Sequence, residues 1–268
     1  MSFQLLTTPS SIGRVLDSGF KLFTSSFKSV FGLVVLSAIV SVIMQYAMVV
    51  VMVPDQAFTT VELSQEYFAK AVPILIVLGI VFWVISIAIY NMVLARVGQF
   101  AVNDGGDLTD AIILGLKKLW PVFLAMVLYM VAIMLGFVLL VIPGLILLLT
   151  LLFFQVLIVN EDAGVVESLK TSHRLVWGNY WRTATVITIP IFIIYALVIV
   201  VALVSGVMMA VESPEAVSEP ALEMSFGFTE VIGAALPAFL MSLLYSMYIV
   251  QVNDLKLRKS GDDLQQRL

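Results

Sequence analysis

Six long runs of the chain contain no Asp, Glu, Lys or Arg, and this feature constrains the fold more than any other. A bilayer core of about 30 Å is crossed by roughly 20 apolar residues in a helix. Because no water reaches that core, every backbone N–H and C=O has to be paired within its own segment, which imposes the helix. The sequence therefore predicts an all-α polytopic membrane protein with six transmembrane helices. They are expected at residues 29–53, 72–95, 121–142, 144–160, 183–211 and 231–252.

The composition agrees with lipid as the main solvent of this chain. Hydrophobic residues make up 61% of the sequence and charged residues 12%, whereas soluble domains carry about 25% charged residues. The absence of cysteine excludes disulfides and thiolate metal sites. With a formal net charge of -4 there is no basic excess, so no nucleic-acid partner is expected. No catalytic, metal or cofactor motif is found in the sequence.

Prolines interrupt or bend the apolar runs. Pro143 and Gly144 break a long apolar stretch, which predicts a tight turn between the third and fourth helices. Pro190 and Pro237 lie inside the fifth and sixth runs, where each removes a helix hydrogen bond and predicts a kink. The fourth run has only 17 residues (144 to 160), so a partial crossing of the membrane stays open for it.

The distribution of Lys and Arg predicts the orientation, because cytoplasmic loops carry an excess of these residues. With both termini in the cytoplasm, 13 of the 14 basic residues lie inside and only Lys70 lies outside. The 13 are Arg14, Lys21, Lys28, Arg96, Lys117, Lys118, Lys170, Arg174, Arg182, Lys256, Arg258, Lys259 and Arg267. The expected external loops carry acids instead: Asp55, Glu62, Glu66, Glu212, Glu215, Glu219 and Glu223.

Three amphipathic segments precede the odd-numbered runs and resemble one another. In each, an acid lies ten residues before an aromatic: Asp17 and Phe27, Asp110 and Trp120, Glu167 and Trp177. Such segments are typical of short helices in the headgroup plane. Asp107 and Asp162 are the expected N-caps of the second and third.

The resulting unit is one interfacial helix followed by two spans, used three times. We expect a single integral membrane domain over residues 1–268, with three repeats at 10–96, 107–160 and 162–253. The alternative is that any amphipathic segment leading into a membrane helix shows this pattern, without a repeat.

The most specific local pattern is VIPGLILLL at 141–149, followed by VNEDAGVVESLKTSHRLVWGNYWR at 159–182. This segment resembles the uncharacterised YciC-like family of bacterial inner-membrane proteins. It is also similar to the membrane domain of membrane-anchored glycerophosphodiester phosphodiesterases. The resemblance implies a helical fold and a bacterial inner-membrane location. It does not imply hydrolase activity, because the activity of those relatives resides in a separate soluble barrel that this chain lacks.

Candidate site residues fall into three groups. Cytoplasmic cations beside lipid predict contacts with anionic headgroups, or only the topology of the chain; they are Lys117, Lys118, Lys170, Arg174 and Arg182. Asn91 and Gln155 are candidates for a polar pocket within the spans, or for hydrogen bonds between packed helices. His173 is the single histidine, and it is either a base that needs an acidic partner or a polar residue at headgroup level.

Three functional hypotheses remain open at this point. The leading one is a non-enzymatic inner-membrane protein that binds or organises anionic lipid or supports another envelope protein. Its expected partners are membrane phospholipids and another membrane protein. The second is a transporter or channel for a small neutral or amphipathic solute, suggested by the repeated two-span unit. The third is a lipid-acting intramembrane enzyme, which lacks a paired base and nucleophile.

Overall fold

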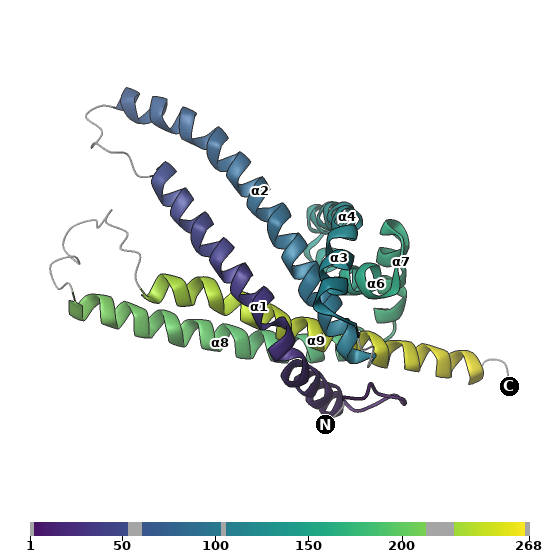
Figure 1. The fold of residues 1–268 in the computed structure, drawn as a ribbon. Helices are drawn as coiled ribbons and strands as arrows, with labels where there is room; N and C mark the ends of the chain where they lie inside the picture. Colours follow the sequence, from purple (N-terminus) through teal and green to yellow (C-terminus); the bar gives the residue numbers. More distant parts are fainter. Residues whose placement is uncertain (1–2, 53–60, 103–105, 213–227, 266–268) are drawn as a thin grey trace.

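The computed structural model describes residues 3–52, 61–102, 106–212 and 228–265, and every regular element among them is an α-helix. The prediction of an all-α protein is therefore confirmed (Figure 1). The helices are α1 (Ile12–Met52), α2 (Val61–Ala101), α3 (Leu108–Lys117), α4 (Leu119–Leu139), α5 (Val141–Thr150), α6 (Phe154–Glu161), α7 (Val165–Val176), α8 (Tyr180–Glu212) and α9 (Phe228–Gln265).

Five helical segments among the described residues are long and apolar enough to cross a membrane, which indicates a membrane-embedded protein. They are Ile12–Met52, Gln65–Ala101, Leu119–Leu139, Val141–Glu161 and Tyr180–Val204. Each contains all or most of one of the first five predicted runs. The sixth predicted run lies within α9, which is not among these five segments. The expected external acids Asp55, Glu215, Glu219 and Glu223, and the cation Arg267, lie outside the described residues.

The long helices are arranged as hairpins that converge at one end of the molecule. Helix α1 packs against α2 and α9, α8 packs along α9, and α4 packs along α5. Figure 1 shows that the α1–α2 hairpin and the α8–α9 hairpin diverge with increasing distance from the place where they meet. Fully buried side chains such as Leu22, Leu94, Leu157 and Leu255 gather where the helices converge. Farther along, large apolar side chains are exposed, as expected for helices surrounded by lipid.

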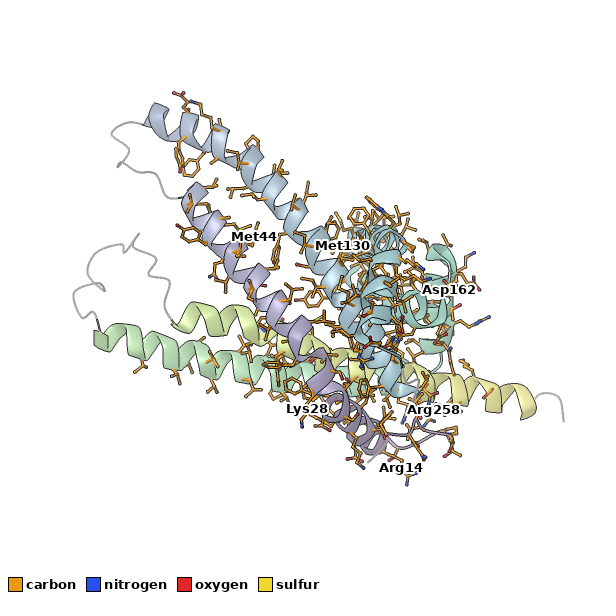
Figure 2. All side chains as sticks on the ribbon, viewed as in Figure 1. Arg14, Lys28, Met44, Met130, Asp162 and Arg258 are labelled. Carbon is orange, nitrogen blue, oxygen red and sulfur yellow. The ribbon has the colours of Figure 1, made fainter. Side chains whose placement is uncertain are left out.

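Most of the charged side chains lie at the end where the helices converge. This region, the charged end, comprises the start of α1, the end of α2, helices α3 and α7, and the end of α9. Figure 2 places Arg14, Lys28 and Arg258 there, whereas Met44 lies far along α1. The apolar core and the polar side chains thus meet at the same end of the molecule.

The first amphipathic segment is not a separate helix, in contrast to the prediction. Residues 12–28 are continuous with the first span in α1. The hydroxyls of Thr24, Ser25 and Ser26 donate hydrogen bonds to carbonyls three residues back in the helix. Side chains that bond back in this way bend helices, and the N-terminal part of α1 runs in a different direction from the rest (Figure 1).

The second and third amphipathic segments are separate short helices, α3 and α7. The predicted N-cap Asp107 is confirmed: its carboxylate accepts from the backbone N–H of Leu108 at 2.7 Å and forms a capping box with Asp110. The prediction for Asp162 is wrong. Asp162 instead ends α6 in the left-handed conformation, with φ of 58°, and Gly164 is the N-cap of α7.

The turn between α4 and α5 is at Leu140, not at Pro143 and Gly144 as expected. Pro143 lies in the first turn of α5, where the missing N–H costs little because that turn has no helical acceptor for it. A Cβ on Gly136 would lie 2.8 Å from the Cα of Gly144, so the two glycines allow the helices to approach closely.

The fourth predicted span consists of two helices, α5 and α6, separated by residues 151–153. Helix α7 packs against both and supplies hydrogen bonds at the break. The Ser172 hydroxyl donates to the carbonyl of Thr150 at 2.7 Å and accepts from the N–H of Phe153 at 3.1 Å. Because backbone groups freed inside a membrane protein need partners, Ser172 stabilises this interruption.

Candidate functional site

The structure brings the two predicted pocket residues, Asn91 and Gln155, into direct contact. The amide of Gln155 donates to the Asn91 side-chain oxygen at 3.1 Å, and the hydroxyl of Tyr245 donates to Gln155 at 3.2 Å. Asn91 and Tyr245 are fully buried. Neither of the two cavities described below is lined by Asn91 or Gln155. The chain of hydrogen bonds joins α2, α6 and α9, which favours packing over a polar pocket.

A buried ion-pair network ties the N-terminal segment to α8 and α9. Arg182 donates to the carboxylate of Asp254 at 2.9 and 3.2 Å, and Arg258 donates to it at 2.9 Å. The Ser10 N–H donates to Asp254 at 2.8 Å, and the Ser10 carbonyl accepts from Arg258 at 2.7 Å. Asp254 is fully buried and completely paired. The network is therefore structural, and it contains Arg182, one of the five predicted headgroup contacts.

The contacts that make up this network were not predicted from the sequence. The one available signal was the spacing of Asp254 and Arg258, because residues four apart on a helix are neighbours. The contribution of Ser10 had no signal in the sequence, since it lies 244 residues from Asp254.

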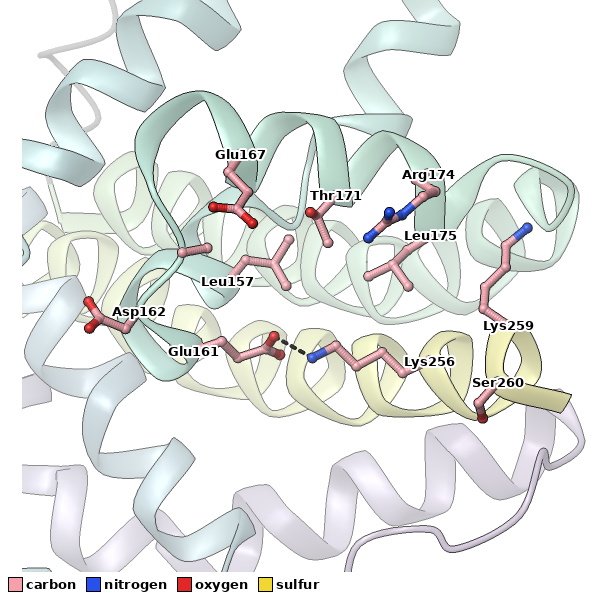
Figure 3. Close-up of a pocket in the computed structure, with 11 residues that line it drawn as sticks. Leu157, Glu161, Asp162, Glu167, Thr171, Arg174, Leu175, Lys256, Lys259 and Ser260 are labelled. Carbon is pink, nitrogen blue, oxygen red and sulfur yellow. Dashed lines mark hydrogen bonds and ion pairs between the residues drawn. The ribbon is translucent and has the colours of Figure 1, made fainter. Parts of the chain in front are cut away.

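The charged end contains a cavity of about 790 Å³ between α6, α7 and α9, which we call the charged cavity (Figure 3). A volume of this size is typical of small-molecule sites. Its lining residues are Leu157, Glu161, Asp162, Ala163, Glu167, Thr171, Arg174, Leu175, Lys256, Lys259 and Ser260. Leu157 and Leu175 are buried and form an apolar floor.

Acids and cations occupy different ends of the charged cavity. The acids Glu161, Asp162 and Glu167 come from the end of α6 and the start of α7. The cations are Arg174 near the end of α7, with Lys256 and Lys259 on α9. Figure 3 shows the two groups on opposite sides of Thr171. The lining therefore carries three side chains of each charge, with the acids and the cations separated along the cavity.

Some of these charges are already paired. Lys256 forms an ion pair with Glu161, and Lys118 forms one with Asp162 from outside the cavity. The hydrogen bond from Lys118 holds the pKa of Asp162 below its usual range. Lys259 donates to the carbonyl of Trp177 at 3.0 Å.

Three of the cavity's charged side chains, Glu167, Arg174 and Lys259, have no partner of opposite charge among the described residues. Within the described parts of the chain, neither Glu167 nor Arg174 takes part in an ion pair. Both belong to α7 and line the cavity, and in Figure 3 the guanidinium of Arg174 lies on the Thr171 side of its backbone. They are therefore free to interact with a ligand.

The five predicted headgroup cations thus lie in different settings. Arg174 lines the charged cavity, Lys118 is 15% exposed in its pair with Asp162, and Arg182 is in the buried network. Lys117 and Lys170 are exposed and lie outside the lining of the cavity. The sequence identified Arg174, but it assigned Lys256 and Lys259 only to the topology.

A second cavity of about 400 Å³ lies between α2, α6 and α9. Its lining is more apolar and includes Leu5, Ala95, Val156, Ile249 and Val252. Glu161 and Lys256 line both cavities, so their ion pair lies at the boundary between them.

His173 has no acidic partner in the described residues. Its ring lies 5.1 Å from that of Trp177, measured between centroids. Trp120, Trp177 and Trp181 are exposed near the charged end, and exposed tryptophans are typical of the headgroup level of a membrane. The arrangement agrees with a polar residue at that level. In the described ranges, no group of three His, Cys, Asp or Glu side chains could hold a metal ion.

Comparison with known proteins gives a family but no described activity. Neither the curated proteins nor the solved structures contain a match to this chain. One family model, described as Domain of unknown function (DUF7847), matches residues 59–252. The match includes α6 and α7, whereas the cavity residues of α9, Lys256, Lys259 and Ser260, lie beyond it. Because this match covers well over half of the chain, the protein belongs to the DUF7847 family.

Proposed function

We propose that this protein is a non-enzymatic membrane protein that binds phospholipids through the anionic phosphate of their headgroups. The observation that carries the proposal is the charged cavity, in which Arg174 has no ion-pair partner among the described residues and Lys259 retains free N–H donors. Cations near a membrane surface each contribute about 1 kcal/mol to the binding of anionic lipid. The exposed Trp177 next to the cavity supports its position at headgroup level.

The proposal includes a topology with six spans and both termini in the cytoplasm of a bacterial inner membrane. In it α9 supplies the sixth span through residues 231–252, and the charged end faces the cytoplasm. The excess of Lys and Arg at the charged end supports this orientation. The three repeats and the relation to the YciC-like proteins belong to the same proposal. The relation to the YciC-like proteins rests on the segment 159–182, which forms the end of α6, all of α7 and the first residues of α8, beside the charged cavity.

The alternative of a transporter has less support, because the polar residues Asn91 and Gln155 are packed and hydrogen-bonded to each other. An enzyme acting on lipid has less support still, because His173 lies against Trp177 without an oriented acid among the described residues.

Lipid extraction in native nanodiscs tests the proposed function. The full-length protein is extracted with its surrounding lipid, and the lipids retained after exchange into an excess of a neutral detergent are identified by mass spectrometry. We expect retained phospholipid in the wild-type protein and about a thirtyfold weaker retention in the double variant Arg174→Gln/Lys259→Gln.

The matched control is Arg14→Gln/Lys21→Gln, which removes two exposed cations from the start of α1 without touching the cavity. It should retain lipid as the wild type does. Equal loss in the two double variants would show that general surface charge, rather than the charged cavity, holds the lipid. No retained phospholipid in the wild type would contradict the proposed function.

A further inference from the structure

The positions of the acids and cations in the charged cavity determine which headgroup fits it. The cavity carries three acids and three cations. A site for a simple anion would be expected to have cations alone, because a nearby carboxylate repels the anion. Here Glu167 lies in the same cavity as Arg174 and has no ion-pair partner among the described residues. A ligand that brings a cation would supply the ion pair that Glu167 lacks.

We propose that the charged cavity recognises a zwitterionic headgroup made of a phosphate and a primary ammonium, as in phosphoethanolamine. Arg174 and Lys259 hold the phosphate, and Glu167 accepts hydrogen bonds from the ammonium. This assignment rests on the proposed function and narrows it to one class of headgroup.

The spacing along α7 agrees with such a ligand. Glu167 and Arg174 are seven residues apart, which is close to two turns of helix and about 10.5 Å along the axis. Both side chains are therefore on the same face, with Thr171 between them (Figure 3). That length accommodates two ion pairs and a headgroup in which two carbons separate the phosphate from the ammonium.

The Glu161–Lys256 pair lies across the cavity from Glu167 and Arg174, with its acid and cation in the same order (Figure 3), and adds a second reason for a dipolar ligand. Glu161 belongs to the acidic side and Lys256 to the cationic side, and they already neutralise each other. A ligand with a single charge would bind beside this pair and leave either Glu167 or Arg174 unmatched. A zwitterion aligned with the pair matches both.

The lining also distinguishes a primary ammonium from a quaternary one. Proteins recognise choline-type ligands with aromatic side chains around the cation, and among the described residues that line the charged cavity none is aromatic. A primary ammonium instead offers three N–H donors. Carboxylates are acceptors only, so Glu167 suits ethanolamine rather than choline.

Competition between lipids tests the inference in the full-length protein. The protein is reconstituted in nanodiscs, and its bound lipids are measured by native mass spectrometry with equimolar phosphatidylethanolamine, phosphatidylcholine and phosphatidylglycerol. We expect preferential binding of phosphatidylethanolamine. Glu167→Gln should reduce its preference over phosphatidylglycerol by roughly tenfold, because one charge-assisted contact is lost. Arg174→Gln should weaken both lipids.

Asp17→Asn is the matched control for Glu167→Gln, because Asp17 is an exposed acid on α1, far from the lining of the cavity. Its preference should equal that of the wild type. A parallel titration with soluble glycerophosphoethanolamine distinguishes the source of the headgroup: binding as tight as that of the lipid would support the zwitterion and point to a free solute, against the proposed lipid function.

Three results would overturn the inference while the proposed function stands: equal binding of phosphatidylethanolamine and phosphatidylglycerol, equal binding of phosphatidylcholine, or an unchanged preference in Glu167→Gln. No binding of any of the three lipids and of the soluble headgroup would contradict both.

Discussion

At the scale of single residues, the polar side chains of this protein serve two different purposes. Those in the buried network around Asp254 hold the N-terminal segment, α8 and α9 together, whereas those in the charged cavity keep part of their charge unmatched. Burial separates the two groups: Asp254 is 0% exposed, and Lys256, two residues later on α9, is 42% exposed.

We predict that Asp254→Asn strongly destabilises the protein. The substitution leaves Arg182 and Arg258 at 17% and 27% exposure without their counter-charge. Breaking a buried ion pair by removing one partner costs about 3–5 kcal/mol. The thermal unfolding midpoint in detergent, followed by intrinsic tryptophan fluorescence, should fall clearly. Asp17→Asn removes an exposed pair with Lys21 and should change stability by no more than about 0.5 kcal/mol. Equal midpoints for the two variants would show that the network adds no stability.

The sequence predicted individual polar residues better than their partners. Asn91 and Gln155 were identified because amides are conspicuous in apolar runs, and the structure joins them by a hydrogen bond. The pairing of Glu161 with Lys256 could not be foreseen, because the two residues are 95 positions apart and only the packing of α6 beside α9 brings them together.

At the scale of helices, close approach depends on small residues at a few crossing points. Helix α3 packs against α2 at Gly115, where an added Cβ would lie 2.7 Å from the backbone nitrogen of Met92. Gly79, which lies in α2 itself, has nothing within 4 Å of such a Cβ. The two glycines therefore offer a matched comparison of the same substitution.

We predict opposite effects for Gly115→Ala and Gly79→Ala. The first pushes α3 away from backbone atoms that cannot move independently, at a cost of about 1–3 kcal/mol. The second adds helix propensity without a clash and should stabilise by about 0.5–1 kcal/mol. Thermal midpoints in detergent measure both changes. A stabilising effect of Gly115→Ala would show that α3 is not held closely on α2.

The spans were predictable because hydrocarbon imposes one backbone conformation on any long uncharged run. Details that depend on competition between alternative local conformations were not predictable. The position of the α4–α5 turn was placed at Pro143, but proline is accepted in the first turn of a helix, so the chain turns earlier at Leu140. Likewise Asp162 suits both an N-cap and a left-handed residue, and the structure uses the second property.

At the scale of the whole molecule, the hairpins converge at the charged end and separate toward the other. The buried core lies in the part near the charged end, and the outer parts of the helices expose apolar side chains. The protein thus holds its helices together on the side where the cavities lie. This arrangement leaves the hairpin of α4 and α5 with an apolar tip.

The tip of this hairpin consists of consecutive large apolar residues, and its exposed side chains identify its surroundings. Val138, Leu140 and Ile142 are 82%, 69% and 70% exposed. Leaving such side chains in water instead of an apolar medium costs roughly 1.5–3 kcal/mol each. The backbone of the tip has few N–H groups that need water. The N–H of Leu140 donates to the carbonyl of Gly136 at 3.1 Å, and Pro143 has no N–H. We therefore predict that the tip lies at the outer edge of the hydrocarbon, where the third and fourth spans end, and does not reach water.

Cysteine labelling measures this directly, because the chain has no native thiols. Leu140→Cys should resist a membrane-impermeant maleimide from either side of the membrane and react fully after denaturation. Gln65→Cys, an exposed position at the start of its span, should react from the outside, and Ser260→Cys should react from the cytoplasm. Labelling of Leu140→Cys as fast as Gln65→Cys would contradict the prediction, because it would mean that the turn between α4 and α5 lies in water.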